Sequence, residues 1–168
     1  LVPKEEVLEE HLAEYPQQQE SKEIPFLNLK KQYLAIKKDI DAAIQEVIDK
    51  GNFILGDNVK ELEKEIASYV GVKHAIGVAS GSDALILALK ALDIGEDDEV
   101  ITTPYTFFAT AGAIANVGAK PVFVDIDEQT LNIDPNKIQK AITKRTKAII
   151  PVHLCGNPCD MDKIMDIA

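Results

Sequence analysis

The stretch Val78-Ala79-Ser80-Gly81-Ser82-Asp83-Ala84-Leu85 places a turn of small residues between an apolar run, His74–Val78, and a helical pattern. A helix that begins at such a turn has backbone N–H groups without intrahelical acceptors, and these groups favour an anion, most often phosphate. Ser82 and Asp83 are both candidate caps, and the Ser82 hydroxyl is a further donor to a bound oxyanion. The alternative interpretation is a capped helix start that binds no ligand.

From His74 onward, short apolar runs alternate with helical patterns. The runs are nearly continuous in apolar residues, which is typical of parallel strands that are covered on both faces. Strand–helix–strand repetition implies right-handed crossovers, so the sequence predicts an α/β fold with a mostly parallel sheet and helices on both faces. The predicted strands are Ala75–Val78, Glu99–Thr103, Pro121–Val124 and Ala148–Val152, and the predicted helices are Asp83–Leu92, Phe107–Val117 and Pro135–Ile142.

In a sheet of this kind, functional loops follow the carboxyl ends of the strands. One of them, Pro104-Tyr105-Thr106-Phe107-Phe108, brings aromatic rings to the rim that carries the small-residue turn. A planar heteroaromatic cofactor needs one face covered, which an aromatic ring does by offset stacking. The alternative is that these rings are part of the core. The four predicted loops are Ala79–Ser82, Pro104–Phe107, Asp125–Leu131 and His153–Pro158.

The other two loops carry polar residues that allow more than one interpretation. Asp125-Ile126-Asp127-Glu128 is either a metal- or ribose-binding cluster or, as we favour, an acidic turn that caps the next segment. Asp134 before Pro135 is typical of a helix N-cap followed by proline at the first helical position. His153 lies just beyond a strand, where it either bonds a substrate or cofactor oxygen or satisfies a loop backbone group.

Composition excludes several classes of protein. The chain has 168 residues, 46% of them apolar and 27% charged, which is typical of a soluble globular protein of about one domain. Its net charge of −10 argues against a nucleic-acid or anionic-membrane surface. No apolar run approaches the roughly 20 residues of a membrane span, and the start lacks the order of a secretory signal. We therefore expect a cytoplasmic protein.

Cysteine and histidine spacing predicts no metal site. Cys155 and Cys159 are separated by three residues, which matches neither a redox pair nor a zinc site. We expect both to be free thiols, as is usual in a reducing cytosol.

The first seventy residues have a different organisation. Residues 1–22 form an acidic arm, interrupted by Pro16 and a glutamine-rich run. Residues 23–71 form a helical segment with an extended start at Ile24–Leu29 and amphipathic helices at Gln32–Asp49 and Asn58–Val70. Residues 72–168 form the α/β part. Because Met161–Ala168 reads as the beginning of another helix, we expect the front portion of a longer protein.

Several stretches in this order resemble the pyridoxal-phosphate-dependent aminotransferases of nucleotide-linked sugars, the DegT/DnrJ-type group, from about Ile24 to the last residue. The stretches are Ile24-Pro25-Phe26-Leu27-Asn28-Leu29, Gly51-Asn52-Phe53-Ile54-Leu55-Gly56, Ser80-Gly81-Ser82-Asp83-Ala84-Leu85, Gly95-Glu96-Asp97-Asp98-Glu99-Val100-Ile101-Thr102, Tyr105-Thr106-Phe107-Phe108-Ala109-Thr110, Val117-Gly118-Ala119-Lys120-Pro121-Val122-Phe123-Val124-Asp125 and Thr146-Lys147-Ala148-Ile149-Ile150-Pro151-Val152-His153-Leu154. The resemblance implies the N-terminal portion of the type I fold of these enzymes.

The resemblance also implies a cofactor site. Gly81, Ser82 and Asp83 fall on the turn whose N–H groups hold the phosphate of pyridoxal 5'-phosphate or pyridoxamine phosphate, and Phe107 falls on the position that stacks on the pyridine ring. The Gly51–Gly56 loop and the segment near Asn28 fall in regions that lie near the nucleotide-sugar cleft at a dimer interface.

In this group, the lysine that forms the Schiff base and the aspartate that pairs with the pyridine nitrogen lie beyond Ala168. We therefore expect no catalytic residue in this chain, and a fragment that is inactive alone. The expected function of the full-length protein, a homodimer, is amino transfer from an amino acid, glutamate, to a nucleotide-linked keto-sugar. The alternatives are a dehydratase of the same group, with histidine in place of the lysine, and a non-catalytic binding or assembly module.

Overall fold

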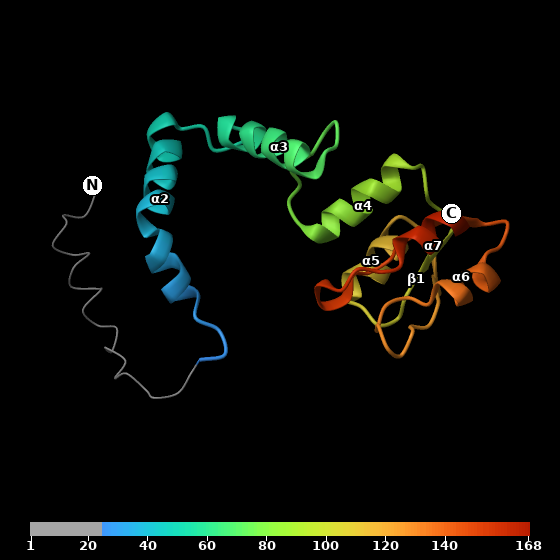
Figure 1. Ribbon diagram of the computed structural model, residues 1–168. Coiled ribbons are helices and arrows are strands. Elements are labelled where there is room, and N and C mark those ends of the chain that lie inside the picture. Colours follow the sequence, from blue (N-terminus) through green and yellow to red (C-terminus); the bar gives the residue numbers. More distant parts are fainter. Residues whose placement is uncertain (1–24) are drawn as a thin grey trace. The chain divides into compact units, whose positions relative to one another are not determined.

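A computed structural model describes residues 25–168 (Figure 1). The chain divides into two compact units, one up to Glu61 and one from Leu62 to Ala168, and each is described by itself. The predicted acidic arm, residues 1–22, lies outside the described residues.

The first unit contains helix α2, Leu29–Lys50. The Asn28 side chain caps its start by accepting from the Lys31 amide at 2.9 Å, and Gly51 ends it in the left-handed region, at φ 64°. The helix begins three residues earlier than predicted, so the extended start is shorter than expected. No residue of α2 is buried within the described chain, and its apolar stripe is exposed.

Helices α3, Asp57–Val70, and α4, Gly81–Ala91, confirm two predicted helices. The strand predicted at Ala75–Val78 is wrong. This segment pairs with no strand among the described residues, and the Ile76 side chain is 80% exposed. An apolar run becomes a strand only when a neighbouring strand completes its hydrogen bonds, and no such neighbour is present in residues 25–168.

The described sheet therefore has three strands rather than the four predicted. Its order is β2-β1-β3 and both pairings are parallel, as expected from the crossovers. The strands are β1, Glu99–Thr102, β2, Lys120–Phe123, and β3, Thr146–Ile149. The remaining helices are α5, Phe108–Asn116, α6, Pro135–Ala141, and α7, Met161–Ile167, with the 3-10 turn η1 at Leu154–Gly156.

The central strand β1 separates two hydrophobic cores. Val100 packs with residues of α4 and α5 on one face, and Ile101 packs with residues of α6 and α7 on the other. Both side chains are fully buried, because successive strand residues point to opposite faces. The predicted parallel sheet with helices on both faces is confirmed.

A charge network closes the amino edge of the sheet. The Glu99 side chain, 3% exposed, accepts from Arg145 Nη2 at 2.6 Å and from Thr143 Oγ1 at 2.6 Å, and Lys120 Nζ lies 3.7 Å away. The Thr143 hydroxyl and the Arg145 guanidinium hold the pKa of Glu99 below its usual value. The Glu99 carboxylate is therefore buried in its charged form, and Arg145 and Thr143 compensate the cost of burying that charge.

Candidate functional site

The small-residue turn forms the N-terminus of α4, but Ser80 caps it rather than Ser82 or Asp83. Ser80 Oγ accepts from the Asp83 amide at 3.1 Å and donates to Asp83 Oδ2 at 2.8 Å. Ser80 is extended, with φ −162° and ψ 166°, and this lets its side chain reach back over the first turn. The amides of Gly81 and Ser82 begin the helix and have no intrahelical acceptor.

The space above this turn is open. A Cβ built on Gly81 would meet no atom within 4 Å, so a group can approach the backbone there. Two amides and the positive end of an eleven-residue helix lie beside that space, and Ser82 adds a hydroxyl to the same turn. This is the donor set that a phosphate requires.

Helices α4 and α5 begin at the same end of the sheet. Their far ends meet: a Cβ added to Gly95 would lie 3.5 Å from the Val117 carbonyl oxygen, and one added to Gly118 would lie 3.5 Å from the Glu96 nitrogen. The two helices pack in one core and are eleven and nine residues long, about 16 and 14 Å. Gly81–Asp83 and Phe107 therefore both lie at the helix starts, the ends remote from the contact between Gly95 and Gly118.

The aromatic residues at the start of α5 are not part of the core. Tyr105, Phe107 and Phe108 are 51%, 77% and 82% exposed. Phe107 is the cap residue of α5 and makes no side-chain capping hydrogen bond. The Phe108 ring lies over its own helix, where a Cβ on Gly112 would be 3.1 Å from it. Of the two phenylalanines, Phe107 is thus the one whose ring is open to a planar ligand.

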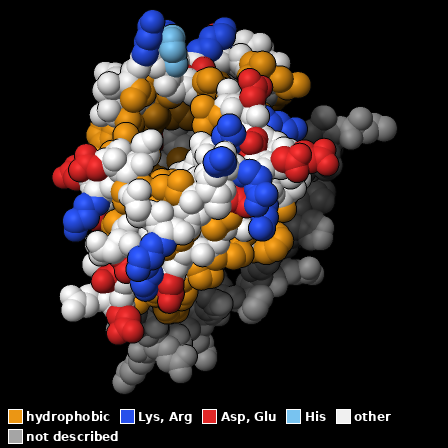
Figure 2. Space-filling model, turned by 90° about the vertical axis from the view of Figure 1, so that its right-hand side faces the viewer, with side chains coloured by type: hydrophobic (Ala, Val, Ile, Leu, Met, Phe, Trp, Pro, Cys, Tyr) orange, Lys and Arg blue, Asp and Glu red, His pale blue; other side chains and the backbone are white. Residues whose placement is uncertain are grey.

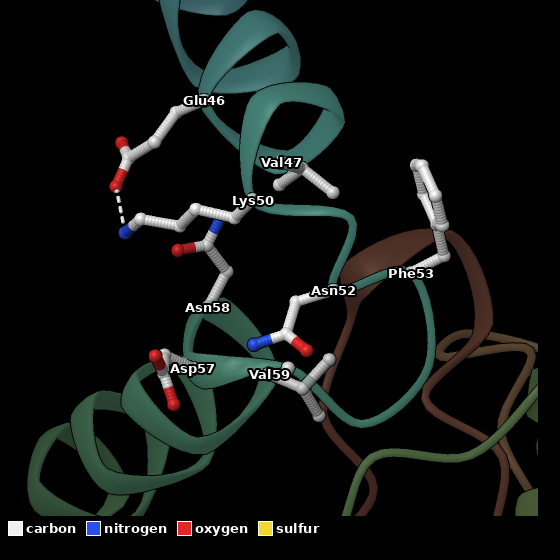
Figure 3. A pocket seen from close by; sticks show the side chains of 9 residues that line it. Glu46, Val47, Lys50, Asn52, Phe53, Asp57, Asn58 and Val59 are labelled. Atoms are coloured by element: carbon white, nitrogen blue, oxygen red, sulfur yellow. Dashed lines mark hydrogen bonds and ion pairs between the residues drawn. The ribbon is translucent and has the colours of Figure 1, made fainter.

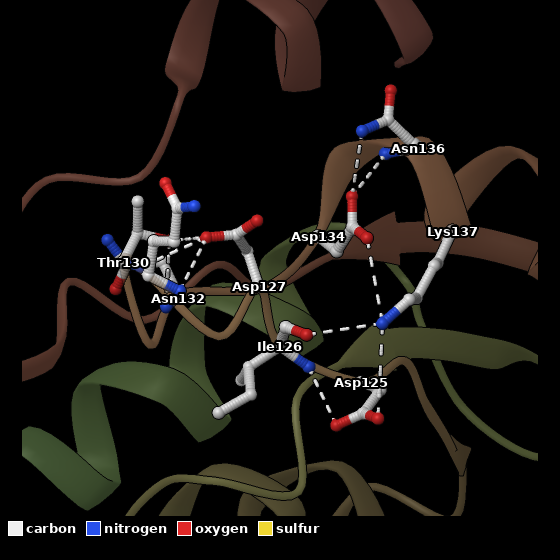
Figure 4. Close-up of polar contacts among 9 residues, drawn as sticks. Asp125, Ile126, Asp127, Thr130, Asn132, Asp134, Asn136 and Lys137 are labelled. Atoms are coloured by element: carbon white, nitrogen blue, oxygen red, sulfur yellow. Dashed lines mark hydrogen bonds and ion pairs between the residues drawn. The ribbon is translucent and has the colours of Figure 1, made fainter.

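The loop after β2 is a turn, as favoured from the sequence (Figure 4). Asp127 Oδ1 accepts from the amides of Gln129 and Thr130, both at 3.0 Å, and these bonds hold the pKa of Asp127 below its usual value. Asp134 caps α6 and Pro135 takes its first position, which confirms that prediction. No group of His, Cys, Asp and Glu within residues 25–168 has the arrangement of a metal site.

The loop after β3 depends on a residue that sequence reasoning missed. Asn132, 3% exposed, donates from Nδ2 to the carbonyls of Asn157 at 2.9 Å and Pro158 at 3.0 Å. Its Oδ1 accepts from the Leu154 amide at 3.2 Å. The sequence offered only a polar residue between Leu131 and Ile133, so nothing in the pattern distinguished it from a solvated side chain.

In the same loop, His153 Nδ1 accepts from the Cys159 amide at 3.0 Å, so the histidine satisfies a loop backbone group. Cys155 and Cys159 are free thiols, as predicted. Cys159 Sγ is buried and donates to the Val152 carbonyl at 3.1 Å, and burial raises the pKa of this thiol.

The first unit has a separate hollow around the Gly51–Gly56 loop (Figure 3). Lys50 pairs with Glu46 on one side of it, at 2.5 Å, and Val47 and Val59 supply apolar walls. A Cβ on Gly56 would lie 2.8 Å from the Asn52 carbonyl oxygen, closer than side chains approach, so the loop folds back on itself only with glycine there.

Hydrophobic side chains reach the surface among charged ones on the face drawn in Figure 2. Among the described helices, none combines the length and apolar character that a membrane crossing requires.

The parallel sheet with helices on both faces defines the fold as α/β, and comparison with known proteins identifies its family. The model of the DegT/DnrJ/EryC1/StrS aminotransferase family matches residues 34–168. The chain belongs to this family.

Two curated relatives show how far the likeness extends. A pleiotropic regulatory protein of Geobacillus stearothermophilus is 55% identical over 145 residues, 86% of this chain and 39% of the relative. The UDP-2-acetamido-2-deoxy-3-oxo-D-glucuronate aminotransferase of Pseudomonas aeruginosa is 52% identical over 145 residues, 86% of this chain and 40% of the relative. The chain spans about two fifths of the curated relatives it matches.

Two solved structures superpose closely. DesV of S. venezuelae, in complex with a ketimine intermediate, gives a TM-score of 0.86 at 44% identity, over 88% of this chain and 40% of that one. NtdA of Bacillus subtilis, with bound cofactor PMP, gives 0.84 at 38% identity, over 92% of this chain and 36% of that one.

Proposed function

We propose that the carboxyl edge of the sheet is the cofactor site for pyridoxal 5'-phosphate and its pyridoxamine form. The amides of Gly81 and Ser82 bind the phosphate with the Ser82 hydroxyl, and Phe107 covers one face of the ring. One observation carries the proposal: the open helix N-terminus and the exposed ring occupy the same rim.

Asp83 has a different part in this site from its two neighbours. Its amide already donates to Ser80 Oγ, and its carboxylate accepts from the Ser80 hydroxyl. Asp83 therefore holds the turn in shape through Ser80. Its amide joins the phosphate donors only when the Ser80 side chain turns away.

The proposed reaction of the full-length protein is transfer of an amino group from an amino acid, glutamate, to a nucleotide-linked keto-sugar. Relatives named as UDP-sugar and dTDP-sugar aminotransferases support this class. When bound, the cofactor supplies the electron sink and carries the amino group. We also propose a homodimer in the cytoplasm, and the exposed apolar side chains of α2 are consistent with such an interface.

Three of the described lysines in the α/β part lie beside carboxylates. Lys120 lies 3.7 Å from Glu99, Lys163 Nζ lies 2.8 Å from Asp160, and Lys137 lies among Asp134, Asp125 and the Ile126 carbonyl. We propose that this chain contributes binding and ring coverage, and that the group that exchanges protons with the substrate comes from elsewhere in the full-length protein.

The binding part of the proposal is tested by titrating this chain with pyridoxamine phosphate and with inorganic phosphate. We expect weak binding of both, with pyridoxamine phosphate the tighter because it also contacts Phe107. With pyridoxal phosphate and borohydride, we expect only slow, unsaturable labelling spread over exposed lysines, and no single lysine labelled stoichiometrically. Equal affinity for the two probes contradicts the ring site, and saturable, stoichiometric labelling of one lysine contradicts the inactive assignment.

The reaction is tested on the full-length protein, given pyridoxal phosphate, ¹⁵N-glutamate and a nucleotide-linked keto-sugar. Mass spectrometry is expected to find ¹⁵N in the sugar. A sugar that has lost water without gaining nitrogen identifies the dehydratase, and an unchanged sugar with every keto-sugar offered favours the non-catalytic module.

A further inference from the structure

The imidazole of His153 has one nitrogen bound to the protein and one free. Nδ1 accepts from the Cys159 amide, so in the neutral ring the proton is on Nε2. Nε2 lies on the other side of the ring and has no hydrogen-bond partner within residues 25–168, and the side chain is exposed. His153 therefore presents a single N–H donor whose direction is set by the bond to Cys159.

The loop that carries His153 is held by buried contacts. The Asn132 amide makes three hydrogen bonds to the backbone between residues 154 and 158, and Cys159 Sγ donates to the carbonyl of Val152. These bonds fix the loop on both sides of the histidine. An imidazole on such a support keeps its orientation without a ligand, which lowers the entropy cost of binding.

His153 and Phe107 follow neighbouring strands. Phe107 follows β1 and His153 follows β3, and these strands pair directly in parallel. Parallel neighbours end at the same edge about 5 Å apart, so Phe107 and His153 both lie in loops at the carboxyl edge of the sheet. The phosphate donors belong to α4, which does not follow either strand. Of the two parts of the cofactor, the ring that Phe107 covers in the proposed site is therefore the part that shares this pair of strands with His153.

From these observations we infer that His153 is a cofactor-binding residue whose Nε2–H donates to an acceptor on the edge of the cofactor ring, with Asn132 as its positioning residue. The inference rests on the proposed cofactor site. It gives Nε2 of His153 a role in binding, in addition to the structural role of Nδ1 in the loop.

Two substitutions separate the two nitrogens of His153. In His153→Asn, the amide oxygen replaces Nδ1 as the acceptor for Cys159, and the distal donor is lost. In His153→Gln, the longer side chain keeps a distal N–H donor and loses the acceptor. Affinities of the chain for pyridoxamine phosphate and for inorganic phosphate are measured for both variants, with melting curves to confirm folding.

We expect His153→Asn to weaken pyridoxamine phosphate binding about fivefold to tenfold, the effect of one hydrogen bond, and to leave phosphate binding unchanged. His153→Gln is expected to bind more like the wild type. The inference is overturned if His153→Asn binds pyridoxamine phosphate normally, or if both probes weaken equally. If the wild type itself does not prefer pyridoxamine phosphate to phosphate, the cofactor site fails, and this inference fails with it.

A measurement on the wild type does not depend on the folding of either variant. In ¹⁵N-labelled chain, long-range ¹H–¹⁵N correlation resolves the imidazole nitrogens, and His74 is the internal control. Pyridoxamine phosphate is expected to shift Nε2 of His153 saturably and inorganic phosphate to leave it in place. Asn132→Asp, which loses both Nδ2 donations, is expected to reduce this shift. No shift of Nε2 with either probe overturns the inference.

Discussion

The two edges of the sheet contrast in how their polar groups are used. At the amino edge, Glu99 is buried and is bonded by Arg145 and Thr143 with Lys120 nearby, so the side chains satisfy one another. At the carboxyl edge, three groups have no partner among residues 25–168. They are the first amides of α4, the Phe107 ring, which is 77% exposed, and Nε2 of His153.

The same three strands thus support one edge that is built for stability and one that is built for binding. Groups without partners at the carboxyl edge lack hydrogen bonds and apolar contacts that would stabilise the fold, and in the proposed site the cofactor supplies them. The contrast leads to separable expectations: changes at the amino edge alter stability, and changes at the carboxyl edge alter affinity.

The largest effect on stability is expected in the central strand β1, which lies between the two edges. Ile101→Ala removes a fully buried side chain from the core beneath α6 and α7, and we expect a loss of about 2–5 kcal/mol in the free energy of unfolding. Urea denaturation measures it. Ile142→Ala, at a side chain that is 39% exposed, is the matched control and should cost much less.

A smaller, purely local effect is expected at the carboxyl edge. Phe107→Ala should weaken pyridoxamine phosphate binding about tenfold, because one ring face loses its cover, and should leave the melting temperature nearly unchanged. Phe108→Ala is the matched control, since Phe108 is equally exposed but its ring lies over Gly112. If both variants bind equally well, Phe107 is not the stacking ring.

The smallest effect is expected from Glu99→Gln, and the difference from the wild type is greatest near neutral pH and shrinks with acid. The pKa of Glu99 is lower in the folded chain than its ordinary value of 4.5. Its stabilising contribution is therefore complete above that value and is lost as pH falls through the folded pKa. Melting temperatures between about pH 7 and about pH 3 should fall less steeply in Glu99→Gln than in the wild type. Glu96→Gln, at an exposed site on the same edge, should follow the wild type.

The sequence predicted the parallel sheet, six of the helices and the rim on which Phe107 lies, because apolar periodicity and helix caps are local signals. It failed where the outcome depends on partners distant in the chain. Ala75–Val78 has the composition of a strand, but no described strand pairs with it.

Long-range pairs were equally hidden from the sequence. Asn132 acts on residues about twenty-five positions away, and Glu99 meets Arg145 forty-six positions away. Contacts at such large sequence separations leave no periodic pattern in the sequence. The cap of α4 was misplaced by two residues, because Ser80, Ser82 and Asp83 are all good caps and only the backbone angles select one.

Gly56 has a consequence for the first unit. Because the Asn52 carbonyl oxygen occupies the space where a side chain would begin, the loop closes through its own backbone and needs no neighbour to shape it. Phe53, Ile54 and Leu55, each more than two thirds exposed, are thereby displayed as a preformed apolar tip. A surface that covers this tip therefore binds a loop whose shape is set by its own backbone. Gly56→Ala would place a methyl group against the Asn52 carbonyl oxygen and force the loop to change its conformation.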